Sequence, residues 1–88
     1  MDQQPAHPKS MWYVYVLKSI KDDKLYTGST NDLRKRLREH NSGQVESTQY
    51  RKPFVLVYYE AGLDEHKARI REHYLKSAWG KRYLKNRI

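Results

Sequence analysis

The chain has 88 residues, no cysteine and a formal charge of +8, from 18 Lys and Arg against 10 Asp and Glu. The length favours one small domain, and the absence of cysteine excludes a disulfide framework, a thiolate zinc site and a cysteine nucleophile. The positive charge favours a polyanionic partner, nucleic acid foremost, and the composition is compatible with a cytoplasmic location.

Residues 1–10 are polar and contain two prolines, so we expect a mobile tail followed by one domain over residues 11–88. The segment is too polar for a secretory signal. No stretch of the chain approaches the ~20 apolar residues of a membrane-spanning helix, so we expect no membrane partner.

Two short strands open the predicted domain. Residues 11–18 are rich in aromatic and β-branched side chains, and their alternation places the odd-numbered ones, Tyr15 among them, on one face of a sheet. A polar turn at residues 21–24 leads to a second strand over residues 25–28, which favours an antiparallel hairpin. Tyr15 and Tyr26 would then be neighbours.

A helix is predicted over residues 32–40, with Thr30 or Asn31 accepting hydrogen bonds from its first free amides. Successive helical residues rotate by about 100°. Two leucines therefore form a narrow buried stripe, and Arg36 and His40 lie together along one border of it.

The second half of the chain continues with one strand and two helices. A polar loop over residues 42–53 precedes a third strand over residues 54–60. A helix then runs over residues 64–79, Gly80 breaks it, and a short basic helix covers residues 81–88. The order strand, strand, helix, strand, helix, helix indicates an α+β domain with a small three-stranded, mainly antiparallel sheet flanked by helices.

Glu72 falls at the edge of the apolar arc of the helix over residues 64–79, where a carboxylate needs a partner. That arc comprises Ala68, Leu75, Ala78 and Trp79. One interpretation of Glu72 is an ordinary ion pair with Arg71 or Lys76. The other is a ligand for a hard cation, since Mg²⁺ is held by one or two carboxylates plus phosphate oxygens and water. Glu65, two turns earlier on nearly the same side, competes for that role.

Taken in chain order, the candidate residues of this sequence resemble the GIY-YIG nuclease superfamily. In that superfamily, two tyrosine-bearing strand motifs precede a helix with an arginine and a later helix with a glutamate. The two motifs appear as YVY at residues 13–15 and YTG at residues 26–28. The arginine corresponds to Arg36, the histidine of the same helix to His40 and the glutamate to Glu72.

The segment REHYLKS at residues 71–77 most resembles the small stand-alone members labelled UPF0213. Two positions depart from the superfamily pattern, because Tyr13 replaces the usual first glycine and Thr27 replaces the isoleucine or valine of the second motif. Neither change removes a catalytic hydroxyl. A late asparagine of the superfamily has a counterpart in Asn86, for which a helix-end role is the alternative.

The resemblance implies hydrolysis of a DNA phosphodiester with one divalent ion, Mg²⁺ or Mn²⁺, on Glu72. Arg36 would stabilise the charge that develops at phosphorus. Tyr15 or Tyr26 would take the proton from the attacking water, and Tyr15 is slightly favoured. An ordinary phenol is ionised only about one part in a thousand at pH 7, so nearby positive charge must lower its pKa. His40 would hold a tyrosine or a phosphate in place, or would be a surface imidazole at the helix end.

Contacts with backbone phosphates are expected from eight cations: Arg34, Lys35, Arg38, Lys52, Lys81, Arg82, Lys85 and Arg87. Such contacts give affinity with little sequence information, so we expect low sequence specificity, with a structure-specific role in DNA repair or recombination. Two alternatives stay open. One is a non-catalytic nucleic-acid-binding module with aromatic stacking surfaces, and the other is a nuclease subunit whose protein partner supplies substrate specificity.

Overall fold

The computed structural model describes residues 11–88, and the tail predicted over residues 1–10 lies outside them. The elements in chain order are β1 (Trp12–Ser19), β2 (Leu25–Thr30), α1 (Leu33–Asn41), β3 (Phe54–Leu63), α2 (Glu65–Lys76) and α3 (Ala78–Lys85), with one 3-10 turn at Glu46–Thr48. This confirms the predicted α+β fold and its element order. Within residues 11–88, no helix combines the length and the apolar character that crossing a bilayer requires.

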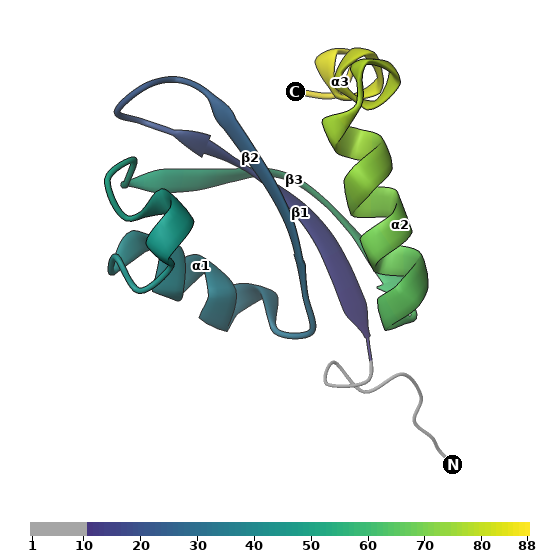
Figure 1. Ribbon diagram of the computed structural model, residues 1–88, viewed down its shortest axis with the longest axis horizontal. Coiled ribbons are helices and arrows are strands. Elements are labelled where there is room, and N and C mark those ends of the chain that lie inside the picture. The colour runs from purple at the N-terminus through teal and green to yellow at the C-terminus, as the bar shows by residue number, and fades with distance from the viewer. Residues whose placement is uncertain (1–10) are drawn as a thin grey trace.

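The three strands form one antiparallel sheet in the order β2-β1-β3 (Figure 1). The central strand is β1, whose residues 14–17 are all buried because helices cover both faces of the sheet. In the hairpin, Tyr15 lies opposite Gly28 and Leu17 lies opposite Tyr26. Since these are odd-numbered positions of β1, Tyr15 and Tyr26 share one face, as predicted.

Each face of the sheet has its own hydrophobic core. The core on the side of α2 and α3 consists of Val14, Val16, Ala68, Leu75 and Leu84. The core on the α1 side consists of Tyr15, Leu17 and Phe54, with Tyr26, Leu33, Leu37 and Leu56 packed against it. Figure 1 shows α1 on one side of the sheet and α2 with α3 on the other. Residues of α1 and of α2 therefore approach the sheet from opposite faces.

The predicted helix break at Gly80 is wrong, because the chain changes direction at Ser77. Ser77 ends α2, and its hydroxyl accepts a hydrogen bond from the Gly80 N–H at 3.2 Å as the N-cap of α3. Gly80 instead permits close packing, since a Cβ there would collide with the carbonyl oxygen of Tyr74. The new helix direction exposes Ala78 and Trp79, which the sequence placed in an apolar arc.

The start of α1 also differs from the prediction. Asp32, and not Thr30 or Asn31, is the N-cap, with its carboxylate accepting a hydrogen bond from the Lys35 N–H at 3.1 Å. The helix begins at Leu33, so the extended residue that precedes it is Asp32. Thr30 supports the cap by accepting a hydrogen bond from the Asp32 N–H at 3.1 Å.

Candidate active site

Tyr15 is the buried centre of the candidate site, with 1% of its surface exposed. Its hydroxyl lies 2.9 Å from Nε2 of His40. The ring packs over the backbone of Gly28, where a Cβ would lie 2.5 Å from the hydroxyl oxygen and 2.7 Å from the ring carbon that bears it. The hydroxyl therefore occupies the space that the missing Gly28 side chain leaves open.

We expect Gly28→Ala to lower the free energy of unfolding by about 1–3 kcal/mol, because a methyl group would be forced into a filled core against a rigid ring. Urea unfolding measures this change. Tyr15→Phe removes the atom nearest to the new methyl, so adding Gly28→Ala to that variant should cost less than adding it to the parent. An unchanged midpoint for Gly28→Ala would contradict the contact.

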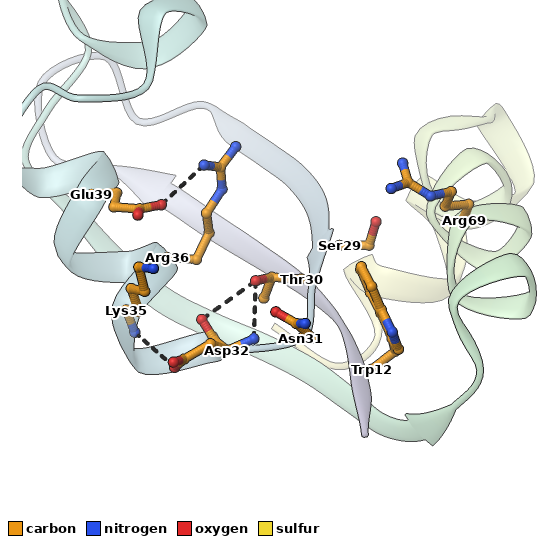
Figure 2. Close-up of a pocket in the computed structure, with 9 residues that line it drawn as sticks. All are labelled: Trp12, Ser29, Thr30, Asn31, Asp32, Lys35, Arg36, Glu39 and Arg69. Atoms are coloured by element: carbon orange, nitrogen blue, oxygen red, sulfur yellow. Dashed lines mark hydrogen bonds and ion pairs between the residues drawn. The ribbon is translucent and has the colours of Figure 1, made fainter. Parts of the chain in front are cut away.

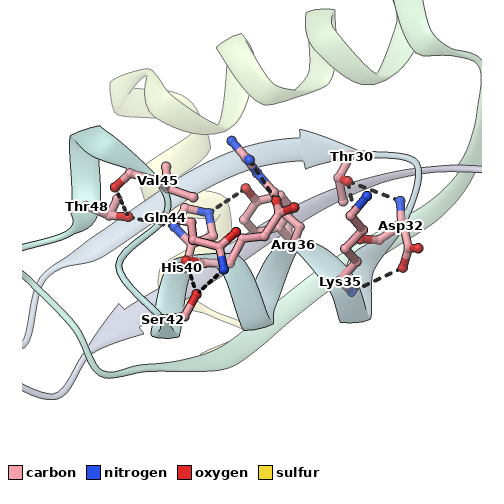
Figure 3. Close-up of polar contacts among 11 residues, drawn as sticks. Thr30, Asp32, Lys35, Arg36, His40, Ser42, Gln44, Val45 and Thr48 are labelled. Atoms are coloured by element: carbon pink, nitrogen blue, oxygen red, sulfur yellow. Dashed lines mark hydrogen bonds and ion pairs between the residues drawn. The ribbon is translucent and has the colours of Figure 1, made fainter.

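His40 is fully buried at the end of α1, so the interpretation as a surface imidazole is wrong. Its Nδ1 lies 2.7 Å from the hydroxyl of Thr48, which in turn donates to the carbonyl of Val45 at 3.4 Å (Figure 3). We therefore assign the proton to Nδ1, which leaves Nε2 to accept the hydrogen bond from Tyr15. Burial, and then the charge of Arg36, lower the pKa of His40 to about 4, so the ring is neutral at pH 7.

Protein stability is expected to fall as the pH drops from about 6.5 to about 4, by on the order of 2–3 kcal/mol. The histidine of the unfolded chain takes up a proton near its ordinary pKa, whereas the buried ring resists protonation until about pH 4. Urea unfolding at several pH values measures the slope. His40→Gln has no titrating ring and should flatten it, and an equal slope in both proteins would contradict the assignment.

Tyr26 and Arg36 complete the α1 side of the site. The Tyr26 ring lies edge-on to His40 with 5.0 Å between ring centroids, and 6.5 Å from the Tyr15 ring. Its hydroxyl makes no hydrogen bond to any other described residue, and the residue as a whole is half-buried. Arg36 lies one turn before His40, and one guanidinium nitrogen lies 3.0 Å from the Glu39 carboxylate.

Arg36 is also close enough to the Tyr15 hydroxyl to influence its ionisation. Burial raises the pKa of Tyr15 to about 12, and the Arg36 guanidinium opposes that rise. The Arg36 side chain is 38% exposed, so one part of it reaches the tyrosine while the rest faces solvent. This placement lets the guanidinium meet an anion that approaches from outside.

Glu72 approaches the edge strand β2 from the face of the sheet that lies opposite to α1. The Ser29 hydroxyl donates to one carboxylate oxygen at 2.7 Å, and the Lys76 ammonium donates to the other at 2.8 Å. The predicted ion pair with Lys76 is thus present, whereas Arg71 pairs with Glu60 at 2.8 Å. Burial raises the pKa of Glu72, but Lys76 and Ser29 outweigh it and hold the pKa below its ordinary value. The carboxylate is charged at neutral pH.

Glu65, the competing acid, lies outside this arrangement. It pairs with Arg69 at 2.8 Å across one turn of α2, and 53% of its side chain is exposed. Because Glu72 is more buried and bonded to β2, it is the acid of α2 that lies next to the candidate site.

Two adjacent residues of β2 join the halves of the site. Gly28 lies opposite Tyr15, and Ser29 lies opposite Val14, so they face different sides of the sheet. Gly28 contacts Tyr15 and Ser29 holds Glu72. The Glu72 charge still reaches Tyr15 and adds to the rise in its pKa. The structure thus brings Tyr15, Tyr26, Arg36 and His40 together and places Glu72 just across a single strand.

A pocket of about 290 Å³ lies where β2 leads into α1, beside this cluster (Figure 2). Its walls include Ser29 and Arg36, and therefore touch both halves of the candidate site. The remaining wall residues that bear on recognition are Trp12, Asn31, Lys35 and Arg69.

The predicted phosphate-binding cations form two separate groups. The first comprises Arg34, Lys35 and Arg38 on α1 and Lys52 in the loop before β3; the second comprises Lys81, Arg82 and Lys85 on α3 and Arg87 just after it. All eight are exposed, but only Lys35 lines the pocket. The α3 group lies across the sheet from α1 (Figure 1). Asn86 is the C-cap of α3, the helix-end position that was its alternative.

Two residues of the site were missed in the sequence. Continuing the β2 alternation by one residue places Ser29 on the face opposite Tyr26, but only the packing of α2 shows that Glu72 lies on that face. Thr48 gave no local signal. It lies in the loop after α1, and only the return of that loop brings it to His40.

A divalent cation could bind at Glu72 only if this one carboxylate were its acidic protein ligand. Residues 11–88 contain no cluster of three or more His, Asp or Glu side chains that could surround an ion. Glu72 is charged and largely buried, and Mg²⁺ commonly takes one carboxylate and completes its shell with water and phosphate. Lys76, about half exposed, would have to leave the carboxylate for an ion to bind.

Known proteins are similar to this chain in sequence and in fold. The sequence profile of the GIY-YIG catalytic domain matches residues 11–86. A UPF0213 protein of Clostridium perfringens is 48% identical over 67 residues, covering 75% of this chain and 71% of that protein. One from Desulfotalea psychrophila is 37% identical over 76 residues, covering 84% and 68%. The solution NMR structure of a UPF0213 protein from Bacillus halodurans aligns with a TM-score of 0.52 and 35% identity, over 86% of this chain and 83% of that one.

Proposed function

Because this chain belongs to the GIY-YIG catalytic domain family, a nuclease superfamily, we propose that it is an endonuclease that hydrolyses DNA phosphodiester bonds with one Mg²⁺ or Mn²⁺ ion. The observation that carries the proposal is the meeting of Tyr15, Tyr26 and Arg36 with Glu72 across one edge strand. Low sequence specificity and a role in repair or recombination, with or without a protein partner, belong to the same proposal.

Arg36 has the position needed to stabilise the transition state. Attack of water on phosphorus increases the negative charge on the non-bridging oxygens, and a fixed guanidinium binds that charge more strongly than it binds the ground state. The Glu39 carboxylate and the Tyr15 hydroxyl orient the guanidinium from within the protein. Its exposed side faces the pocket, where a phosphate can enter.

We propose Tyr26 as the acceptor of the proton of the attacking water, in place of the initial preference for Tyr15. The Tyr15 hydroxyl is buried, bonded to neutral His40, and has a raised pKa. All three features disfavour its phenolate. Tyr26 is less buried, and its hydroxyl has no partner within residues 11–88. Tyr15 then serves to position Arg36.

Glu72 would hold the divalent ion, with Ser29 fixing the orientation of the carboxylate. When bound, such an ion supplies positive charge that stabilises the oxygen leaving phosphorus. Hydrolysis forms the bond between water oxygen and phosphorus and breaks the bond to the leaving sugar oxygen, which takes up a proton.

A cleavage assay tests the proposal with labelled single-stranded, duplex and flap DNA in Mg²⁺, in Mn²⁺ and in EDTA. The parent should cut at least one substrate with either metal and none in EDTA. Tyr26→Phe should bind DNA normally and cut about 10²-fold or more slowly, the usual worth of a general base. A parent that binds all three substrates and cuts none would favour the non-catalytic binding module.

A further inference from the structure

The pocket between β2 and α1 offers three kinds of contact on a small surface. Trp12 supplies an aromatic ring, Lys35 and Arg69 supply positive charge, and Asn31 supplies an amide that both donates and accepts hydrogen bonds. Figure 2 shows Thr30 and Asn31 on one side of the Trp12 ring and Arg69 on the other. The Arg69 guanidinium carbon lies 5.7 Å from the ring centroid.

We propose that this pocket binds one unpaired nucleotide of a DNA strand beside the scissile phosphodiester, with its base on Trp12, its polar edge at Asn31 and its phosphate at Lys35. The inference rests on the proposed function, because it places the substrate strand at the same site. It adds the substrate class, which is DNA with an unpaired nucleotide at the point of cleavage.

Two polar side chains of the pocket, those of Asn31 and Lys35, are available to a ligand, whereas the third, Arg69, pairs with Glu65 at 2.8 Å. The Asn31 side chain is exposed and makes no hydrogen bond to another described residue. Lys35 has no acidic partner in the part of the chain that the structure describes. The two acids of the walls are both engaged, since Asp32 caps α1 and Glu39 pairs with Arg36. The hydrogen-bonding groups that the pocket leaves free are therefore the Asn31 amide and the Lys35 ammonium.

Size and position favour a single nucleotide. The volume of about 290 Å³ lies just below the usual range for ligand pockets, about 300–1,000 Å³, and suits one base rather than a base pair. Ser29 links the pocket to Glu72, and Arg36 links it to Tyr15. A base within a duplex is stacked and paired, so only an unpaired base can turn its face to Trp12.

Tryptophan fluorescence tests this contact without cleavage. The chain has two tryptophans, and Trp79→Phe leaves Trp12 as the one reporter. In EDTA, a short oligothymidylate should quench Trp12 emission by stacking, whereas an abasic strand of equal length should bind through its phosphates without comparable quenching. Equal quenching by the two strands, or quenching by neither, would overturn the proposal.

Binding affinity provides a second test of the same contact. It is measured from the fluorescence anisotropy of labelled strands in EDTA. Trp12→Ala should weaken oligothymidylate binding about tenfold, whereas Trp12→Phe keeps an aromatic face and should lose much less. Abasic strands and a blunt duplex of two separate strands should bind Trp12→Ala within about twofold of the parent. Equal loss for all strands, with an unchanged unfolding midpoint, would overturn the stacking role.

The proposed nuclease activity and the proposed nucleotide pocket can each be disproved without disproving the other. The binding experiments contain no divalent ion, so a protein that never cuts DNA can still show base-dependent quenching of Trp12. Conversely, cutting within duplex DNA with no base-dependent quenching would remove the unpaired-nucleotide pocket and retain the nuclease.

Discussion

Arg36→Ala is expected to slow DNA cleavage by about 10²- to 10³-fold, the usual loss when one donor to a developing oxyanion is removed. Arg36 lines the pocket and acts on the Tyr15 hydroxyl. Binding should fall only slightly, because a single phosphate contact supplies a small part of the affinity. Single-turnover rates at saturating protein measure the chemical step apart from binding.

Arg34→Ala is the matched control for this prediction. Arg34 has the same charge on the same helix, is exposed and does not line the pocket. Its removal should weaken binding at low salt and leave the single-turnover rate nearly unchanged. Arg36→Lys retains the charge without the fork of donors and should recover only part of the rate. Equal rate losses for Arg34→Ala and Arg36→Ala would reduce Arg36 to one phosphate contact among several.

Glu72→Gln is expected to slow metal-dependent cleavage by about 10³-fold, since a bound cation contributes several kcal/mol of charge stabilisation and each 1.36 kcal/mol is tenfold in rate. The substitution preserves shape, so the amide oxygen can still accept from Ser29. Stability should change by less than about 1 kcal/mol, because the lost ion pair with Lys76 is partly exposed. Initial rates and Mn²⁺ binding by calorimetry, both with DNA present, measure the two effects.

The matched control is Glu65→Gln, which removes an acid from the same helix two turns earlier. Glu65 is exposed and paired with Arg69, so neither metal binding nor cleavage should change more than about twofold. Loss of cleavage with undiminished Mn²⁺ binding in Glu72→Gln would contradict the assignment of the metal to this carboxylate.

Local patterns in the sequence determined the elements and the first half of the site. Alternation in β1 and the short turn to β2 place Tyr15 and Tyr26 on one face, and that prediction is confirmed. The helical period placed Arg36 one turn before His40, also as the structure has it. Such signals depend on residues close together in the chain, where geometry leaves few choices.

Other features depended on how distant segments pack. Ser77 and Gly80 are both residues that commonly end helices, and the break falls at Ser77 because Gly80 is needed where α3 approaches the backbone of α2. A histidine at the end of a basic helix also gives no sign of burial. The loop after α1 returns with Thr48 and covers His40, which removes its charge at neutral pH.

By itself, then, the chain specified its strands, its helices and the approach of the tyrosines to Arg36, because each follows from the repeat of a strand or a helix. The family resemblance had already grouped Glu72 with them, but only the tertiary structure placed its carboxylate near them. Its carboxylate reaches the opposite face of β2, and the thickness of one strand, with Gly28 and Ser29 facing opposite ways, separates it from Tyr15. No local period encodes that distance, since it depends on where α2 packs against the sheet.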